Sequence, residues 1–497
     1  MFMRTFAKSV LVITAFAVGT RIIGFVFRIF LSRILGAEML GVYQMSMSIF
    51  MVLLTVISSG LPLVMSREVA KAAKDRARVA NITVAGLVIG VAAAVLLCLI
   101  VLACQSLLGW VFTDERSIAI LLAMLPAIIA SSIYCVLRAV WWGEKKFFLL
   151  GLTELIEQVA RVVLFVLLLG FTFYFANLAN LAAWSFTGAC IVSAVIVIII
   201  FCKSNKLSKQ DRHQENFIKP LLKSAAPITG VRFISSMAFP IISVLLPLRL
   251  VAAGWSNVAA ISHYGIIVGM TFPLLTIPST VISALATALV PELSTMAAKQ
   301  DWPQVRAQVK TVLKFTIFIN FIFIPVYLAL GPGIGNFLYS DINSGIYLAR
   351  SAWAMVPLSL SQITNTTLNS LGKEGIAMRN YFLGSIVLFV AIWCLPAVLG
   401  ADAVLLGLGA AMSIATIFNI FAIRKYTHWQ TPDKTLATIT AYAVVCLPVL
   451  AIGYFGYQLC AALPLFFSLA IAGSLACGAF FVLTWATNLI ILPKKRQ

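Results

Sequence analysis

The residues of this sequence best placed to do chemistry are charged side chains inside apolar segments. Arg21 and Arg28 lie seven residues apart in one such segment, so on a helix they share a face. Arg232 takes a comparable place in a later segment. A charge deep in a membrane helix bundle is costly and usually lines a cavity or pairs with a partner. Because a guanidinium group is planar, permanently charged and matched to phosphate oxygens, we predict that these three arginines bind a phosphate or diphosphate.

A second charged group mixes acids and bases. Glu154, Glu157 and Arg161 are three and four residues apart, which places them on one helix face and lets Glu157 pair with Arg161. Arg138 lies one turn inside the preceding apolar segment, at a depth that matches Glu154 and predicts an ion pair between neighbouring helices. We predict a gating or coupling role for these four residues. Five arginines against two glutamates leave a net charge of 5 − 2 = +3 in these segments.

The elements that carry these charges are membrane-spanning helices. The 497 residues are 62% hydrophobic and 10% charged, whereas a soluble domain has about 25% charged residues. Apolar runs of about 20 residues, enough to cross a bilayer, recur along the whole chain. We therefore expect an all-α, polytopic membrane protein with about fourteen spans. The expected spans are 9–34, 40–66, 80–108, 117–142, 151–175, 180–202, 218–248, 258–291, 306–330, 346–371, 377–399, 402–423, 436–458 and 462–492.

Positive charge predicts the orientation of these spans. With the N-terminus inside, the inner connections and termini carry 27 Lys and Arg residues and the outer connections carry 4, while 5 lie within helices, which accounts for all 36. Such a bias is typical of loops that stay in the cytoplasm. We expect a bacterial inner-membrane protein with both termini in the cytoplasm and an uncleaved first helix. The same placement explains the net charge of +20 without nucleic acid.

A weak internal repeat predicts the domain organisation. Tyr43 and Tyr264 each lie ten residues before a Leu-Leu-Thr run, and the features around them recur in the same order. We expect a six-helix lobe over 1–202, a cytoplasmic linker over 203–217, a second six-helix lobe over 218–435, and two further helices over 436–497. Lobes repeated in parallel usually enclose a central substrate site.

Uncharged polar residues and cysteines receive structural interpretations. The polar run 361–370 either contacts sugar hydroxyls or, as we favour, bridges helices. The nine cysteines lie in apolar segments without a CxxC pair, so we expect neither disulfides nor metal ligation. We expect no cofactor, and coupling to the membrane potential, H⁺ or Na⁺.

Several motifs resemble a known family. These are TRIIGF (20–25), SRILGA (32–37), GAEMLGVYQ (36–44), SGLP (59–62) and LTELIEQVAR (152–161). The chain resembles the polysaccharide-transport branch of the multidrug/oligosaccharidyl-lipid/polysaccharide (MOP) exporter superfamily, of the stage V sporulation protein B and MurJ-like flippase type. In MurJ-like flippases, cavity arginines bind the diphosphate of the substrate, and Arg21 matches one of those positions. Another falls on Phe27, with Arg28 one residue later.

The resemblance implies a flippase, not an enzyme. It would move an undecaprenyl-diphosphate-linked sugar, such as a peptidoglycan precursor or polysaccharide repeat unit, to the outer leaflet by alternating access, as a monomer in contact with membrane lipids. The last two helices would guide the lipid tail. Two alternatives stay open. A cation-coupled multidrug exporter would favour buried carboxylates, and a membrane glycosyltransferase or ligase would need catalytic acids, bases or metal ligands.

Overall fold

The computed structural model describes residues 2–72, 75–171, 177–204, 217–429, 435–487 and 489. Throughout these residues the regular elements are helices, and no strand occurs. Twelve helical segments among them are long and apolar enough to cross a membrane. The protein is therefore an all-α, multi-pass membrane protein, as predicted. Most of the predicted linker and the basic C-terminal residues lie outside the described residues.

The chain forms two compact units. Unit 1 comprises residues 1–247 and 257–265, and unit 2 comprises residues 248–256 and 266–497. The helices of unit 1 are α1 (Phe2–Ser58), α2 (Gly60–Lys71), α3 (Arg76–Ala103), α4 (Gln105–Val111), α5 (Arg116–Gly143), α6 (Phe147–Leu169), α7 (Leu178–Ser204), α8 (Ile218–Ser236), most of α9 (Ala238–Ala252), and α10 (Asn257–Gly265).

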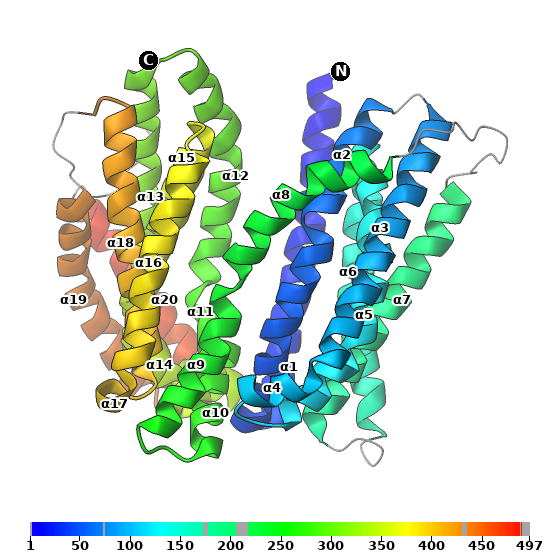
Figure 1. Cartoon of the computed structure of the whole chain (residues 1–497). Helices are drawn as coiled ribbons and strands as arrows, with labels where there is room; N and C mark the ends of the chain where they lie inside the picture. The colour runs from blue at the N-terminus through cyan, green and yellow to red at the C-terminus, as the bar shows by residue number, and fades with distance from the viewer. Residues whose placement is uncertain are drawn as a thin grey trace. The chain divides into compact units, whose positions relative to one another are not determined.

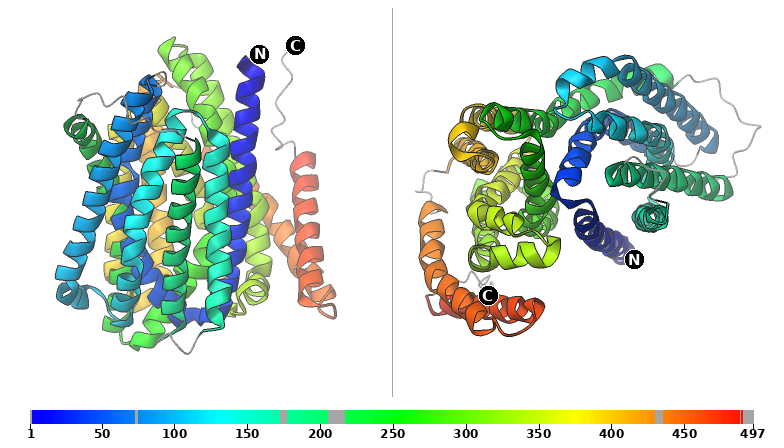
Figure 2. Two further views of the ribbon diagram at one scale, coloured as in Figure 1. Left: turned by 90° about the vertical axis from the view of Figure 1, so that its right-hand side faces the viewer. Right: turned by 90° about the horizontal axis from the view of Figure 1, so that it is seen from below.

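Unit 2 is built around the long helix α13. Its elements are η2 (Ile266–Thr271), α11 (Phe272–Leu275), α12 (Ile277–Ala298), α13 (Trp302–Tyr339), α14 (Ile342–Ser351), η3 (Ala352–Ala354), α15 (Met355–Ser370), α16 (Glu374–Cys394), α17 (Pro396–Leu399), α18 (Asp402–Tyr426), α19 (Thr435–Leu459) and α20 (Leu465–Ala486). The last two helices pack on α13 along one side of this unit (Figure 2).

Helix α1 contains two of the predicted spans. Its 57 residues would extend about 85 Å as one straight helix, far more than the roughly 30 Å hydrocarbon core. The break lies at Gly36, whose φ of 69° and ψ of 176° are not helical. Glycine alone adopts this conformation readily. The first half of α1 runs down from the N-terminus and the second half returns upward (Figure 1).

Close approach of backbones holds several helices of unit 1 together. A Cβ atom on Gly60 would lie 2.4 Å from the carbonyl oxygen of Ala225 in α8, and one on Gly41 would lie 2.3 Å from that of Ile261 in α10. Because these glycines lack side chains, α8 packs on α2 and α10 packs on α1. Helix α8, which we predicted to begin the second lobe, therefore makes its contacts within unit 1. The lobe boundaries given above stay a prediction.

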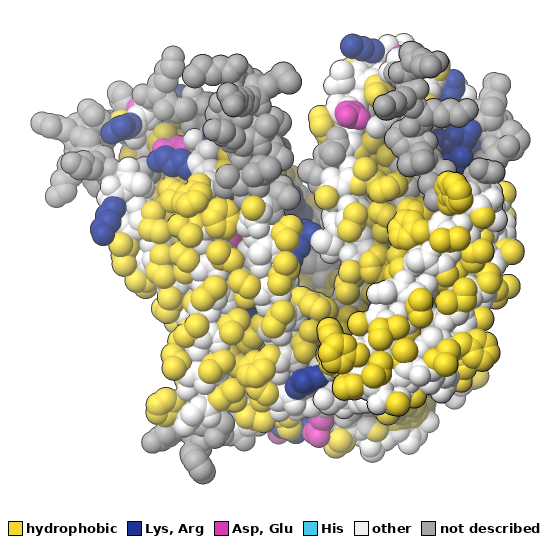
Figure 3. Space-filling view, turned by 180° about the vertical axis from the view of Figure 1, so that it is seen from behind, with side chains coloured by type: hydrophobic (Ala, Val, Ile, Leu, Met, Phe, Trp, Pro, Cys, Tyr) yellow, Lys and Arg dark blue, Asp and Glu magenta, His cyan; other side chains and the backbone are white. Residues whose placement is uncertain are grey.

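The surface matches a membrane environment. Hydrophobic side chains cover the sides of the helices, whereas most Lys and Arg side chains lie near the helix ends (Figure 3). Large apolar side chains such as Leu459, Leu447 and Val444 are more than 60% exposed. Contact of these side chains with lipid chains costs no free energy, whereas their exposure to water would be unfavourable.

Candidate functional site

Arg21 and Arg28 lie on α1, which packs against α6. The backbone of α1 comes close to α6 at Gly19 and Gly24, where an added Cβ would lie 3.8 Å from Leu155 and 3.7 Å from Gln158. Both arginine side chains are exposed. Phe27, at the position where the family resemblance places another arginine, packs edge-to-face against Phe165 of α6 at 5.5 Å. Position 27 therefore contributes to helix packing in this protein, and the positive charge lies one residue later, on the exposed Arg28.

Arg232 lies on α8 and is also exposed. Helix α8 packs on α1 and α2, so all three predicted phosphate-binding arginines belong to unit 1. Their convergence on one chamber stays a prediction. Pro227 lies within α8 and takes one hydrogen bond out of its ladder.

Arg138 joins α5 to α6, as predicted. Its Nη2 atom donates a hydrogen bond to the carbonyl oxygen of Leu150 at 2.9 Å and lies 3.3 Å from the carboxylate of Glu154. Its Nη1 atom donates to the Tyr134 hydroxyl at 3.0 Å, and the guanidinium lies 4.8 Å from the centre of the Tyr134 ring. The ion pair is confirmed. Tyr134 and the Leu150 carbonyl are partners that we did not predict, although Tyr134 lies one turn before Arg138 on the same face.

Glu157 and Arg161 pair along α6, as their spacing predicted. Arg161 Nη2 donates to Glu157 Oε1 at 3.0 Å, and the two side chains are only 18% and 20% exposed. The Arg161 guanidinium also lies 4.6 Å from the centre of the Phe186 ring of α7. This contact between helices has no signal in the spacing of charges. It gives Arg161 a cation–π partner that a low-dielectric site strengthens.

The buried Tyr43 links these charges to α1. Its hydroxyl interacts electrostatically with both Arg28 and Arg161, and its side chain is 6% exposed. Arg161 and Glu157 in turn interact with Cys190 of α7. Tyr43 therefore lies within electrostatic range of one charge on α1 and one on α6. Among the described residues, the Nε atoms of Arg138 and Arg161 are buried without a hydrogen-bond partner.

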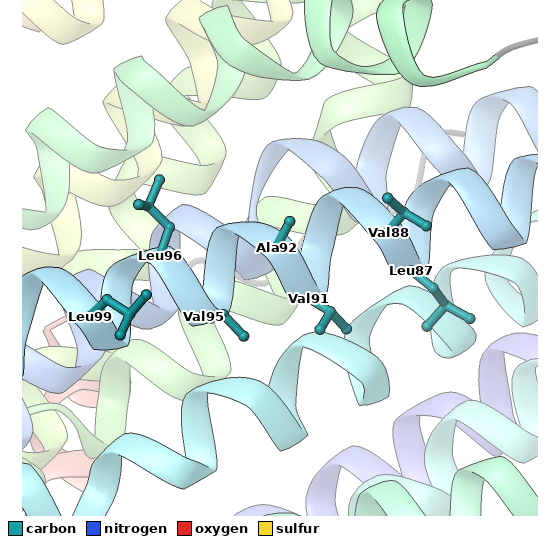
Figure 4. Close-up of a pocket in the computed structure, with 7 residues that line it drawn as sticks. All are labelled: Leu87, Val88, Val91, Ala92, Val95, Leu96 and Leu99. Carbon is teal, nitrogen blue, oxygen red and sulfur yellow. The ribbon is translucent and has the colours of Figure 1, made fainter.

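A shallow, open apolar hollow lies along α3. Its lining side chains are those of Leu87, Val88, Val91, Ala92, Val95, Leu96 and Leu99 (Figure 4). They offer no charge and no hydrogen bond, so this surface suits hydrocarbon chains and not a phosphate.

Unit 2 contains a neutral polar network that joins three of its helices. Asn380 of α16 donates to Oδ1 of Asn419 in α18 at 2.9 Å. The amide of Asn419 donates to Asn365 at 2.8 Å and to Thr364 at 3.1 Å, both in α15. The preferred interpretation of the polar run 361–370, that it bridges helices, is confirmed for these two residues. Within the described part of the chain, no group of three or more His, Cys, Asp or Glu side chains could hold a metal ion.

An ion-pair network of unit 1 lies where α5 begins, with Asp114 just before this helix and Glu38 two residues after the break in α1. Arg116, at the start of α5, contacts Asp114 and Glu38 at 2.6 Å each. Burial alone would raise the pKa of Asp114, but hydrogen bonds from the side chain and backbone of Arg116, together with its charge, lower that pKa below its ordinary value. Asp114 is therefore ionised near neutral pH. The ion pairs of Arg116 with Asp114 and Glu38 link the start of α5 to α1.

The fold and the internal charges define a multi-pass α-helical membrane protein with arginine-rich spanning helices. Residues 6–297 match the model of the polysaccharide biosynthesis protein family, and the chain belongs to that family. Two solved structures share the fold at 14% identity. An inward-facing MATE-family multidrug resistance transporter has a TM-score of 0.69 over 83% of this chain and 96% of its own. The lipid II flippase MurJ, in an inward closed conformation, has a TM-score of 0.67 over 97% of this chain and 100% of its own.

Two Bacillus subtilis (strain 168) proteins are similar in sequence. Stage V sporulation protein B is 26% identical over 456 residues, which cover 89% of this chain and 88% of that protein. Sporulation protein YkvU is 22% identical over 206 residues, which cover 40% of this chain and 45% of that protein. The predicted resemblance to the polysaccharide-transport family, to stage V sporulation protein B and to the MurJ fold is thus confirmed.

Proposed function

We propose that the protein is a flippase for an undecaprenyl-diphosphate-linked sugar precursor, such as a peptidoglycan precursor or a polysaccharide repeat unit. The observation that carries this proposal is the excess of arginine in unit 1. Among the described spanning residues, Arg138 and Arg161 contact Glu154 and Glu157, while Arg21, Arg28 and Arg232 add three positive charges with exposed side chains. A net charge of +3 suits a diphosphate and disfavours the cationic substrates of many drug exporters.

In this proposal the three exposed arginines clamp the diphosphate, and the four residues of the second charged group serve gating or coupling. The apolar hollow along α3 and the exposed faces of α19 and α20 are surfaces on which a polyprenyl chain can lie. With both termini in the cytoplasm, export moves two negative charges outward, in the direction favoured by an inside-negative potential. Each charge contributes about 2.3 kcal/mol per 100 mV.

The test is translocation of a fluorescent polyprenyl-diphosphate sugar in liposomes that contain the purified protein. We expect Arg21→Ala to lower the translocation rate at least tenfold, because the phosphate loses a charge-assisted partner. Arg21→Lys should retain part of the rate, since a point charge replaces the bidentate fork. Arg33→Ala, on the same helix but outside the proposed clamp, is the matched control.

Two outcomes would contradict the proposal. One is wild-type translocation by a correctly folded Arg21→Ala variant. The other is an equal loss of rate in the Arg21→Ala and Arg33→Ala variants, which would indicate a general effect of charge on α1. Gel filtration and helical circular dichroism of each variant establish that the protein is folded.

A further inference from the structure

The end of α18 in unit 2 gathers positive charge from three helices. Helices α13 and α16 begin, and α18 ends, at the same end of this unit (Figure 1). We define the basic cluster as Arg306 and Lys310 of α13, Lys373 before α16, and Lys425 in the last turn of α18. None of these four residues is among the five arginines of unit 1 that give its spanning helices their positive charge.

Specific contacts bring the basic cluster together around residues 426–429. Arg306 Nη1 donates hydrogen bonds to the carbonyl oxygens of Thr427 at 2.9 Å and His428 at 3.0 Å. The ammonium of Lys310 lies 5.7 Å from the ring centre of Trp429. The ammonium of Lys373 lies 4.6 Å from the ring centre of Tyr426. The four cations therefore surround the same turn, although they are up to 119 residues apart in sequence (425 − 306).

The helix end itself needs only part of this charge. Arg306 satisfies two carbonyl groups, and Lys425 in the last turn favours the negative end of the helix dipole. Lys310 and Lys373 satisfy no carbonyl in this way. The ion pairs formed among the described residues include none of the four. By contrast, Arg350 at the other end of unit 2 pairs with Asp402 at 2.6 Å.

The surroundings identify the kind of partner. Tyr426 and Trp429 supply aromatic rings beside the cations, and Trp302 lies against His428 with ring centres 6.4 Å apart. Trp and Tyr beside Lys and Arg at the end of an apolar helix bundle are typical of the membrane–water interface. Lysine stems can lie along apolar surface there while their ammonium groups reach the headgroup layer. The partner that matches this depth and charge is the phosphate of an anionic lipid.

We propose that the basic cluster is a binding site for the headgroups of anionic phospholipids, separate from the predicted phosphate clamp of unit 1. Clustered Lys and Arg side chains next to membrane helices attract anionic lipids, and each adds to the binding free energy. The site would hold bilayer lipid at the end of α13, α16 and α18 whether or not a substrate is bound.

The experiment compares lipid retention by the full-length protein released from nanodiscs and weighed by native mass spectrometry. The discs contain equal amounts of phosphatidylglycerol and phosphatidylcholine. We expect the wild type to retain phosphatidylglycerol preferentially. In the variant Lys310→Gln/Lys373→Gln/Lys425→Gln, the ratio of retained phosphatidylglycerol to retained phosphatidylcholine should fall at least tenfold. The control Lys71→Gln/Lys219→Gln/Lys223→Gln removes the same charge from three exposed lysines of unit 1 and should keep it.

Three results would overturn the proposal. The first is equal retention of the two lipids by the wild type, and the second is an equal loss of lipid preference in the cluster and control variants. The third is displacement of the retained lipid by millimolar inorganic phosphate, which would indicate a site for free anions. If the triple variant does not fold, the single variant Lys373→Gln replaces it and should show a smaller loss in the same direction. Transport is not measured in this experiment, so its outcome is independent of the flippase proposal.

Discussion

Units 1 and 2 hold their helices together with different polar chemistry. In unit 1, ion pairs lie within the helices, as between Glu157 and Arg161. In unit 2, the amides of Asn380 and Asn419 and the hydroxyl of Thr364 join α15, α16 and α18 without charge. A neutral network fixes helix positions at modest cost in a membrane, whereas a charged one is expensive and is kept where charge is used. We therefore expect unit 1 to bind the substrate anion and the neutral network to brace the helices of unit 2.

The largest effect on stability is expected for Arg161→Gln. This substitution leaves the Glu157 carboxylate in a site where it is only 20% exposed, and an unpaired buried charge costs about 3 kcal/mol. Thermal unfolding in detergent should show a clear fall in the midpoint. The double variant Glu157→Gln/Arg161→Gln should recover most of the loss, because no isolated charge remains. A double variant no more stable than the single one would contradict a paired role.

Asn419→Ala tests the bracing role in unit 2. It removes the acceptor for Asn380 and the donor for Asn365 and Thr364, all within a buried region. We expect a loss of about 1–2 kcal/mol, measured as the unfolding midpoint, with the translocation rate per folded molecule unchanged. A folded Asn419→Ala protein that no longer translocates substrate would break the proposed division between the units.

Glu154→Gln should have a smaller effect. Glu154 is 49% exposed and lies 3.3 Å from Arg138, and an exposed ion pair contributes about 0–1 kcal/mol. Arg138 also retains Tyr134 and the Leu150 carbonyl as partners. We expect little change in the unfolding midpoint, so a change in translocation rate would report on gating or coupling. No change in either quantity would remove Glu154 from the proposed machinery.

A small effect that depends on pH is expected for Asp114. Because its folded-state pKa lies below the ordinary value of 3.8, the ionised carboxylate stabilises the fold above about pH 3.8 and loses this contribution as the pH falls further. Asp114→Asn should lower stability by about 0.5–1 kcal/mol near pH 6. The difference from the wild type should shrink near pH 3. A difference that grows on acidification would contradict the assignment.

Sequence predicted the features that depend on spacing along one helix. Apolar length predicted the spans, and the i, i+4 rule predicted the pair of Glu157 with Arg161. The sequence did not predict Phe186 as a partner of Arg161, because the rotation of α7 against α6 depends on the packing of many side chains. Nor did it predict that α8 packs with unit 1, which depends on the backbone approach at Gly60. Small residues permit such contacts without specifying which helix makes them.

The break at Gly36 has a practical consequence for labelling and proteolysis. Where two spans are joined through a single non-helical residue, there is no connecting loop that a protease or antibody could engage. A Cβ atom at this position would meet no other atom within 4 Å, so the obstacle to substitution is the backbone angle and not lack of room. An epitope tag placed there would have to unwind helix on both sides before an antibody could bind it.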